Sequence, residues 1–286
     1  MRKSGIFGTV VVALSAAAFL LAPAGPAAAA PVGYWNFEEG TPGNPLAGAN
    51  SVLDQTPNAN HGSPSGNPGY SGDVAAGAGA ASLALDGSGD YVTIANSGAL
   101  NLSSAFTVEF RMKAGTAGNS GLRLLVDKSH GFVDSTGWTF QLNNGLVNLN
   151  TGAGGGGAGN FPGGASTTNV LDNQWHHIAG TYDITDVGQE LKLYIDGVLE
   201  GAFNVAPYAD NTRNVTIGAA CTFIGCPFGA QRFFNGNFDD LRISDTALTA
   251  DQFLIAQTEI PEPAALALLA AGLCGLAVVR RRRRHI

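Results

Sequence analysis

QWHHIAGTYDITDVGQELKLYIDGVLEG, residues 174–201, predicts two β-strands followed by a hairpin. Residues 178–182 form a short run rich in β-forming side chains. Residues 191–195 alternate apolar and polar side chains, which is the period of a strand with one buried face. Asp196-Gly197 follows, and Asp-Gly favours a type I′ turn because both central residues need a positive φ. The stretch therefore predicts the central part of an antiparallel sheet.

The rest of the chain continues this pattern, and Trp175 is expected to cover one end of the core. Within residues 106–113, Val108, Phe110 and Met112 are expected to face inward, with the charged residues between them facing outward. Glycine-rich and asparagine-rich stretches at residues 40–80 and 152–164 predict loops. The other expected strands lie at residues 32–38, 82–85, 91–94, 122–127, 138–142, 146–150, 215–218 and 238–243, and a short helix is expected at residues 246–257. Many short strands with turn residues between them predict an all-β sandwich of one domain, residues 31–256. Tyr34 is expected to face inward in the first strand, with Trp35 or Phe37 as a further inward candidate.

Six segments of the chain, in order, resemble laminin-G-like domains of the concanavalin A-like lectin/glucanase superfamily in bacterial exported proteins. They are GYWNFEEG (33–40), DQTPNANHG (54–62), SLALDGSGDYVTI (82–94), FTVEFRMK (106–113), the hairpin stretch (175–201) and NGNFDDLRISDTAL (235–248). The resemblance implies a concanavalin A-like jelly-roll β-sandwich made of two antiparallel sheets.

The N-terminal 30 residues have the three parts of a secretory signal peptide. Arg2 and Lys3 are basic, residues 6–21 are apolar, and Ala28-Ala29-Ala30 is a small-residue cleavage site. The alternative is an uncleaved membrane anchor. The sequence thus predicts an exported protein.

The C-terminal end, residues 257–286, has a second tripartite pattern. Pro261-Glu262-Pro263 precedes an apolar run at residues 264–279, and arginines occupy residues 280–284. This tail resembles the PEP-CTERM sorting signal of Gram-negative bacteria, which implies a transmembrane sorting helix and processing by an exosortase. The alternative is a plain C-terminal membrane anchor.

The charge of the expected mature chain is strongly negative. The sequence has 15 Lys and Arg and 22 Asp and Glu; the two ends carry seven of the basic residues and two of the acidic ones, which leaves a net charge of −12. An acidic surface argues against nucleic acid and anionic lipid as partners, and is compatible with calcium or neutral glycans.

Two of the three cysteines predict a local disulfide. Cys221 and Cys226 lie close in sequence in an exported domain, where the compartment is oxidising. The alternative is two free thiols, and the short spacing without a nearby histidine argues against zinc.

Calcium is the expected cofactor. The loop from Asp54 to Gly62 is rich in oxygen ligands, and Asp239-Asp240 lies on the last strand. The resemblance suggests a structural Ca²⁺ held by Asp54, Asn58 and either Asp239 or Asp240, with Glu38 as a further ligand. Strand alternation allows only one of the two adjacent aspartates to face such a site. The alternative is that the loop residues form turns.

Catalysis is not expected. Glycosidases of this architecture need two carboxylates across a cleft, and the usual Glu-x-Asp-x-x-Glu pattern does not occur in this sequence. Glu109 is expected on a solvated outer face. His176-His177 are expected to serve packing, because adjacent strand residues point to opposite faces.

Carbohydrate binding is the function that the sequence favours. Sugar sites use exposed aromatic rings beside amides and carboxylates. The candidate ring side chains lie in loops: Tyr70, Phe161, Tyr208, Phe223 and Phe228. The alternative is that these rings close the ends of the sandwich. We therefore expect an exported, non-catalytic envelope or extracellular-matrix protein that binds carbohydrate or mediates adhesion. A structural surface protein without a ligand and a polysaccharide-degrading enzyme are the other hypotheses.

Overall fold

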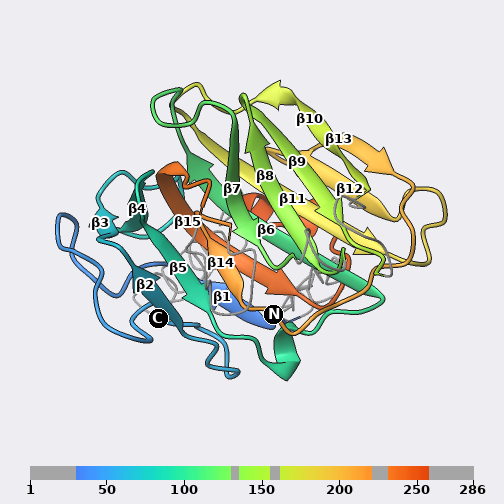
Figure 1. The fold of residues 1–286 in the computed structure, drawn as a ribbon, viewed down its shortest axis with the longest axis horizontal. Coiled ribbons are helices and arrows are strands. Elements are labelled where there is room, and N and C mark those ends of the chain that lie inside the picture. The colour runs from blue at the N-terminus through green and yellow to red at the C-terminus, as the bar shows by residue number, and fades with distance from the viewer. Residues whose placement is uncertain (1–29, 130–134, 155–161, 221–230, 258–286) are drawn as a thin grey trace, which may run out of the picture.

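The computed structural model describes residues 30–129, 135–154, 162–220 and 231–257, which form two antiparallel sheets packed face to face (Figure 1). The eight-stranded sheet has the order β13-β12-β11-β6-β15-β4-β3, and β1 pairs with β15 as well. The seven-stranded sheet has the order β10-β9-β8-β7-β14-β5-β2 and lies in front in Figure 1. The expected jelly-roll-like all-β sandwich is confirmed.

The strands are short, as the density of turn residues predicts. Those of the eight-stranded sheet are β1 (Gly33–Trp35), β3 (Gly69–Ser71), β4 (Ser82–Asp86), β6 (Ala105–Lys113), β11 (Trp175–Asp183), β12 (Leu191–Ile195), β13 (Val198–Phe203) and β15 (Asn235–Ser244). Those of the seven-stranded sheet are β2 (Gly62–Ser65), β5 (Tyr91–Ile94), β7 (Leu122–Asp127), β8 (Trp138–Asn143), β9 (Leu146–Thr151), β10 (Gly163–Asn169) and β14 (Val215–Ile217). The helical turns are η1 (Gly98–Leu100), η2 (Ala250–Gln252) and α1 (Leu254–Gln257).

The core lies between the inner faces of the two sheets. Val108, Phe110 and Met112 of β6 are fully buried there, as their alternation predicts. The ring of Phe110 meets that of Phe140 from β8 edge-on, with 5.3 Å between ring centroids. Offset or edge-on ring pairs of this kind add stability beyond the area that they bury. This contact joins one sheet to the other.

Two two-residue hairpin turns, one of them the predicted Asp196-Gly197 turn and the other an Asn-Gly turn, have the backbone that type I′ requires. Asp196 and Gly197, between β12 and β13, have φ values of 51° and 77°. Asn144 and Gly145, between β8 and β9, have φ values of 51° and 93°. Positive φ at both central positions matches the twist of the flanking strands, so each turn sets the pairing of its hairpin.

Several elements differ from the expectation. β2 and β3 lie within residues 40–80, and β10 begins inside the glycine-rich stretch, where loops were predicted. In the first strand Trp35 and Phe37 are buried in the core, whereas Tyr34 points to the other side. The expected helix at residues 246–257 is reduced to η2 and α1.

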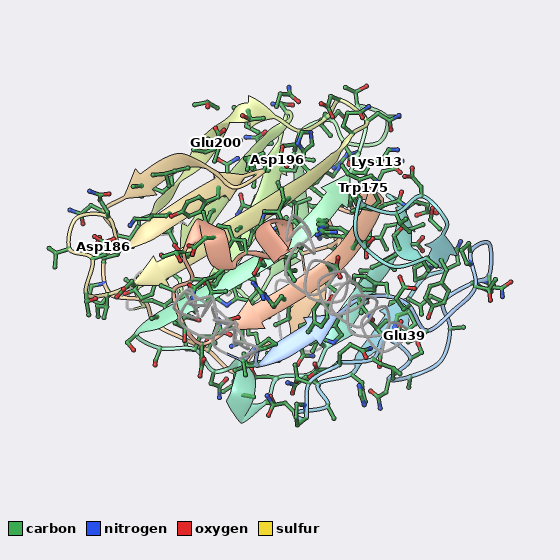
Figure 2. The ribbon with its side chains drawn as sticks, turned by 180° about the vertical axis from the view of Figure 1, so that it is seen from behind. Glu39, Lys113, Trp175, Asp186, Asp196 and Glu200 are labelled. Carbon is green, nitrogen blue, oxygen red and sulfur yellow. The ribbon has the colours of Figure 1, made fainter. Side chains whose placement is uncertain are left out.

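The C-terminal segment, residues 245–257, lies across the outer face of the eight-stranded sheet (Figure 2). We call "outer" the face turned away from the seven-stranded sheet. Phe253 is fully buried and packs with Leu248 against Ala179 of β11. The hydroxyl of Thr107 on β6 holds the start of the segment, because it donates to the carbonyl of Thr246 and accepts from the N–H of Leu248. The outer face is therefore covered along its centre.

Some sequence predictions fall outside the described residues. These are the signal peptide except Ala30, the sorting tail with Pro261, Glu262 and Pro263, and the Cys221–Cys226 disulfide. Within the described part of the chain, no helix is long and apolar enough to cross a membrane. The domain boundaries at residues 30 and 256 stay predictions.

Candidate functional site

A buried ionic cluster lies on the outer face of the eight-stranded sheet, under the C-terminal segment. Glu109 of β6 accepts a hydrogen bond from Arg242 Nε of β15 at 2.7 Å and lies 2.8 Å from His177 Nε2 of β11. The backbone N–H of Leu254 also donates to Glu109, at 2.9 Å, and Arg242 donates to the carbonyl of Gln252. The cluster ties three central strands to the C-terminal segment.

Glu109 is fully buried, so the expectation that it lies on a solvated face is wrong. Its side chain does point outward, but the C-terminal segment covers it. Burial alone would raise the pKa of Glu109; the hydrogen bond to His177 and the charge of Arg242 outweigh it and hold the pKa below its ordinary value. Glu109 is therefore an ionised structural group.

A β-bulge in β15 changes how Asp239 and Asp240 point. The pairing of β15 with β6 shifts register between Asp239 and Arg242, and Asp240 has a φ of 50°. Asp240 Oδ2 lies 3.2 Å from Arg111 Nη1, and its Oδ1 accepts a hydrogen bond from the Tyr34 hydroxyl at 2.6 Å. Asp239 accepts from the N–H of Ala75. The extra residue of a bulge breaks strict alternation, so both carboxylates lie on the outer side.

A pocket of about 230 Å³ lies beside these aspartates; we call it the Glu38 pocket. It is lined by Tyr34, Asn36, Glu38, Gly77, Ala78, Gly79, Arg111, Asp240 and Leu254. Two buried oxygens in this region, Asn36 Oδ1 and Asp239 Oδ1, have no hydrogen-bond partner among the described residues. Burial, and then the neighbouring charge of Asp240, raise the pKa of Asp239 to about 7. The region thus holds acceptor oxygens that lack a donor or a cation.

Asp54 and Asn58 lie elsewhere and form a turn. Asp54 Oδ1 accepts from the N–H groups of Tyr34 and Thr56, and its Oδ2 accepts from the Thr56 hydroxyl and the Asn60 N–H. Asn58 donates to the carbonyl of Val32 at 3.0 Å. These bonds occupy both carboxylate oxygens of Asp54 with protein donors. Of the predicted calcium ligands, Glu38 and Asp240 line one pocket and Asp239 is the chain neighbour of Asp240, whereas Asp54 and Asn58 do not line it.

A second pocket, of about 210 Å³, lies on the same face; we call it the Trp175 pocket. It is lined by Ala75, Ala76, Arg111, Trp175, His176, His177, Asp196 and Ile255. Arg111 lines both pockets, so its side chain lies between them. Figure 2 labels Trp175 and Asp196 on this face. Trp175, expected to cover an end of the core, is half-buried, and its indole N–H donates to Asp73 at 2.9 Å.

The two histidines near the start of β11 were expected to serve packing, but each is bonded to carboxylates: His177 to Glu109, and His176 to two aspartates. His176 Nδ1 lies 2.8 Å from Asp196 Oδ2, and its Nε2 lies 3.1 Å from Asp172 Oδ1. The hydrogen bond to Asp196 raises the pKa of His176 above its ordinary value, against the effect of burial. Asp196 Oδ1 also accepts from the N–H of His177. Asp196 thereby fastens the β12–β13 turn to β11.

The described loop aromatics offer little ring surface to a ligand. Tyr70 lies in β3 and is 8% exposed. Tyr208 packs against Phe106 and Tyr182, and its hydroxyl donates to Asp210 at 2.6 Å. Both positions fit the alternative that these rings close the sandwich. Phe161, Phe223 and Phe228 lie outside the described residues.

The sequence prediction did not include Asn36, Arg111 or Trp175 as site residues. A signal for Asn36 was present, because Trp35 and Phe37 are apolar neighbours that place Asn36 on the opposite side of the strand. No local signal joins Trp175 to Ile255, since they lie far apart in the chain and meet only in the fold. Among the described residues, no group of three or more His, Cys, Asp and Glu side chains is placed to hold a metal ion. Asn36 is not one of these four residue types, and its amide Oδ1 is a further oxygen in the lining of the Glu38 pocket.

Comparison with protein families gives two matches. Residues 86–253 match the model of the concanavalin A-like lectin/glucanases superfamily. Residues 259–284 match the PEP-CTERM protein-sorting motif, which indicates export and sorting to the cell envelope. No curated protein matches the sequence.

Solved structures similar to this chain include a neurotoxin binding domain and a domain of an arabinanase. The botulinum neurotoxin serotype D binding domain matches with a TM-score of 0.58 at 11% identity, covering 80% of this chain and 51% of that one. Domain 4 of a GH43 extracellular arabinanase from Geobacillus stearothermophilus, in complex with arabinotriose, matches with a TM-score of 0.55 at 18% identity, covering 80% and 98%. This chain thus spans about half of the length of the neurotoxin domain. At such identities the likeness concerns the fold.

Proposed function

The chain belongs to the concanavalin A-like lectin/glucanases superfamily, and from this membership we propose that it is an exported, non-catalytic protein whose sandwich binds carbohydrate. It acts at the cell envelope or in extracellular matrix of a Gram-negative bacterium, where it mediates adhesion. An exosortase-type enzyme processes the PEP-CTERM tail, which holds the protein at the membrane until then. A structurally similar domain solved with arabinotriose supports the proposal.

The observation that carries the proposal is the pair of pockets on the outer face. Each is small and is lined by residues from several segments of the chain, with a few polar side chains among apolar groups, which is the usual construction of a small-ligand site. The bond networks of Arg111, Asp240 and Asp196 fix these side chains in place before any ligand arrives. Preformed sites of this kind lose little entropy on binding.

The state of Glu109 supports a non-catalytic role. A glycosidase needs a carboxyl pair about 5–9.5 Å apart with access to the scissile bond. Glu109 is fully buried and is bonded to His177, Arg242 and the Leu254 N–H, so it reaches no substrate. Asp240 is held by Arg111 and Tyr34. These acids stabilise the sheet.

A glycan array with the purified full-length chain tests carbohydrate binding. We expect retention of a restricted set of glycans, and no release of reducing ends or unsaturated products from the same glycans on incubation. A protein that retains no glycan would be the structural surface protein of the alternative hypothesis. Product release would identify a polysaccharide-degrading enzyme.

A structural Ca²⁺ is the second part of the proposal. Calcium takes six to eight oxygen ligands, often from carboxylates, amides and backbone carbonyls of several segments. Asn36 Oδ1 and Asp239 Oδ1 are buried without partners, and Glu38 lines the pocket beside them. The donor set fits a hard cation, which would satisfy both oxygens. Asn36 and Asp239 are therefore the proposed ligands, and Glu38, whose carboxylate oxygens accept hydrogen bonds from the N–H groups of Ala80 and Ala81, lies beside them.

Thermal melting with calcium and with excess EDTA tests this site. A ligand that binds the native state stabilises it by RT ln(1 + [L]/Kd), so calcium should raise the melting temperature. Asp239→Asn should abolish this shift. Asp54→Ala is the matched control: it should lower the melting temperature in both buffers, because a turn loses its acceptor, and should keep the calcium shift. A calcium shift that survives Asp239→Asn contradicts the assignment.

A further inference from the structure

The Trp175 pocket is built by five parts of the chain, one of which is β6 with Arg111. Trp175 and His177 lie near the start of β11, Asp196 lies in the turn between β12 and β13, and Ile255 belongs to the C-terminal segment. The loop after β3 supplies Ala75 and Ala76 on the remaining side. Residues two apart on a strand share a face, so the rings of Trp175 and His177 lie side by side on the outer face of β11.

The apolar part of this pocket comes from one aromatic ring and small aliphatic groups. Trp175 is half-buried, and its indole N–H is already bonded to Asp73, so the face of the ring is the part left for a ligand. Ala76 is exposed at the rim, and Ile255 is half-buried. A flat ring beside small apolar groups suits a ligand with one apolar face.

The polar part is set by His177, which is 3% exposed and has an Nδ1 without a partner among the described residues. Its Nε2 faces Glu109, which Arg242 and the Leu254 N–H hold as a carboxylate. The proton of a neutral His177 therefore lies on Nε2, and Nδ1 is left as an acceptor. A buried acceptor without a donor is costly, so a ligand hydroxyl, directly or through a water molecule, would stabilise it. Asp196, exposed in the hairpin turn, has one hydrogen bond on each carboxylate oxygen, so the second lone pair of each oxygen is the acceptor that it can offer.

The positive charges around this pocket are already paired with acids of the chain, which are in excess. Arg111 pairs with Asp240, and His176 lies between Asp172 and Asp196. An anionic ligand would therefore find no unpaired positive charge among these groups. The volume, about 210 Å³, is below the roughly 300–1,000 Å³ of pockets for drug-sized molecules, so it holds one small unit.

We propose that the Trp175 pocket binds a single neutral sugar unit at the end of a glycan chain, with the apolar face of the sugar on the Trp175 ring and its hydroxyls on His177 and Asp196. The inference rests on the carbohydrate-binding function proposed above and adds its location and ligand class. The walls formed by the loop after β3, the hairpin and Ile255 bound the pocket, which favours a terminal unit over the middle of a chain.

Variants of two kinds test the pocket on the same glycan array, with the full-length chain. Trp175→Ala removes the stacking surface, and Ala76→Trp fills the pocket from an exposed rim position without removing a bond. Both should weaken retention by about tenfold or more. Lys192→Ala, on β12 and absent from the pocket lining, is the control and should bind as the parent does. Melting temperatures show whether each variant is folded.

Tryptophan fluorescence gives an independent measure. The chain has three tryptophans, and Trp35 and Trp138 are fully buried, so Trp175 is the one that acrylamide reaches most readily. Neutral monosaccharides (glucose, galactose, mannose and arabinose) serve as probes. At least one should protect Trp175 from acrylamide and should compete with the retained glycans on the array.

The outcomes separate this inference from the proposed function. If the parent binds glycans and folded Trp175→Ala and Ala76→Trp bind them equally well, the pocket assignment is wrong while carbohydrate binding stands. If the parent binds no glycan, the proposed function fails and the inference fails with it. Protection by charged sugars in place of the neutral ones overturns the ligand class.

Discussion

Glu109 shows how much of this structure depends on single buried charges. Its carboxylate lies where β6, β11, β15 and the C-terminal segment meet, and it bonds to each of the other three. Burying a carboxylate is costly unless charges and hydrogen bonds compensate for it. His177, Arg242 and the Leu254 N–H provide that compensation here. Removing the acid would leave a buried guanidinium and an N–H without their acceptor.

We predict that Glu109→Ala lowers the free energy of unfolding by about 3–5 kcal/mol, the usual cost of breaking a buried ion pair from one side. Denaturant titration measures it. Asp186→Ala is the matched control, because the Asp186–Lys192 pair is half-exposed and such pairs contribute less than about 1 kcal/mol. Equal losses for the two variants would mean that the Glu109 cluster is not structural.

For single residues, the sequence predicted the side of the sheet to which a side chain points better than it predicted whether that side chain is buried. Alternation correctly placed Val108, Phe110 and Met112 inward, and it correctly turned Glu109 outward. It missed that Glu109 is covered, because the covering segment comes about 140 residues later. It also missed the bulge at Asp239 and Asp240, since the extra residue has no strong local signature in Phe-Asp-Asp-Leu.

The hairpins set the pairing of neighbouring elements, and the β12–β13 turn gives a prediction. Gly197 has a φ of 77°, and an added Cβ would meet its nearest atom, in Ile255, at 3.8 Å. Gly197→Ala therefore has space, and its cost is the left-handed backbone alone, about 1–2 kcal/mol. Thermal or denaturant unfolding measures the loss.

Gly98→Ala is the control for this substitution. Gly98 lies in η1, has no positive φ and has open space around its Cβ position. Its replacement should be neutral or slightly stabilising, because alanine restricts the unfolded chain. A loss at Gly98 equal to that at Gly197 would show that φ is not the cause.

Glu200 joins the edges of the two sheets. From β13 it accepts hydrogen bonds from the N–H and hydroxyl groups of Thr167 and Thr168 on β10. Burial opposes ionisation, but these four bonds outweigh it and lower the pKa of Glu200 to about 2. The edge strands β13 and β10 are thus joined by hydrogen bonds of side chains and not by strand pairing.

We predict that Glu200→Ala destabilises the protein by about 1–2 kcal/mol at neutral pH, after allowing for the partial exposure of the group. A lowered carboxyl pKa stabilises the fold above the unfolded pKa of 4.5, and this contribution is lost as the pH falls towards 2. The difference between parent and variant should therefore shrink between pH 4.5 and pH 2. Denaturant unfolding across this range measures it, and a difference that does not vary with pH would contradict the role of the ionised acid.

At the scale of elements, the long alternating strands and the Asp-Gly and Asn-Gly turns could be predicted from the sequence. β2, β3 and β10 could not, because their residues are mostly Gly, Ser, Pro and Thr. Such segments have weak intrinsic preference for a strand and are held by the neighbouring strand. Tyr70 was expected in a loop for this reason.

The whole molecule has one core shared by two sheets, so it should unfold as one unit. Trp35 of β1 and Trp138 of β8 lie on different sheets, and both are fully buried. We predict that tryptophan fluorescence and far-ultraviolet circular dichroism report coincident denaturant transitions, the sign of a two-state process. Separate midpoints for the two probes would show that one sheet survives without the other.

The overall architecture was predictable because six ordered segments and the strand pattern both indicated it. The pockets were not, because each is assembled from segments that no local pattern connects. The Glu38 pocket joins the first strand, a glycine-rich loop and the last strand; the Trp175 pocket adds a hairpin turn and the C-terminal segment. Sites of this kind depend on the full topology.

The path of the C-terminal segment determines how force would enter the protein. Leu254–Gln257 lies on the outer face, and the match to the sorting motif begins at residue 259. A pull transmitted through the tail therefore loads this segment before any strand. The hydrogen bond from the Leu254 N–H to Glu109 and the packing of Phe253 would break first, one contact after the other. β15 would bear the load only afterwards. Because Leu254 and Ile255 belong to the walls of the two pockets, tension on the tail would open both before it disturbed the core.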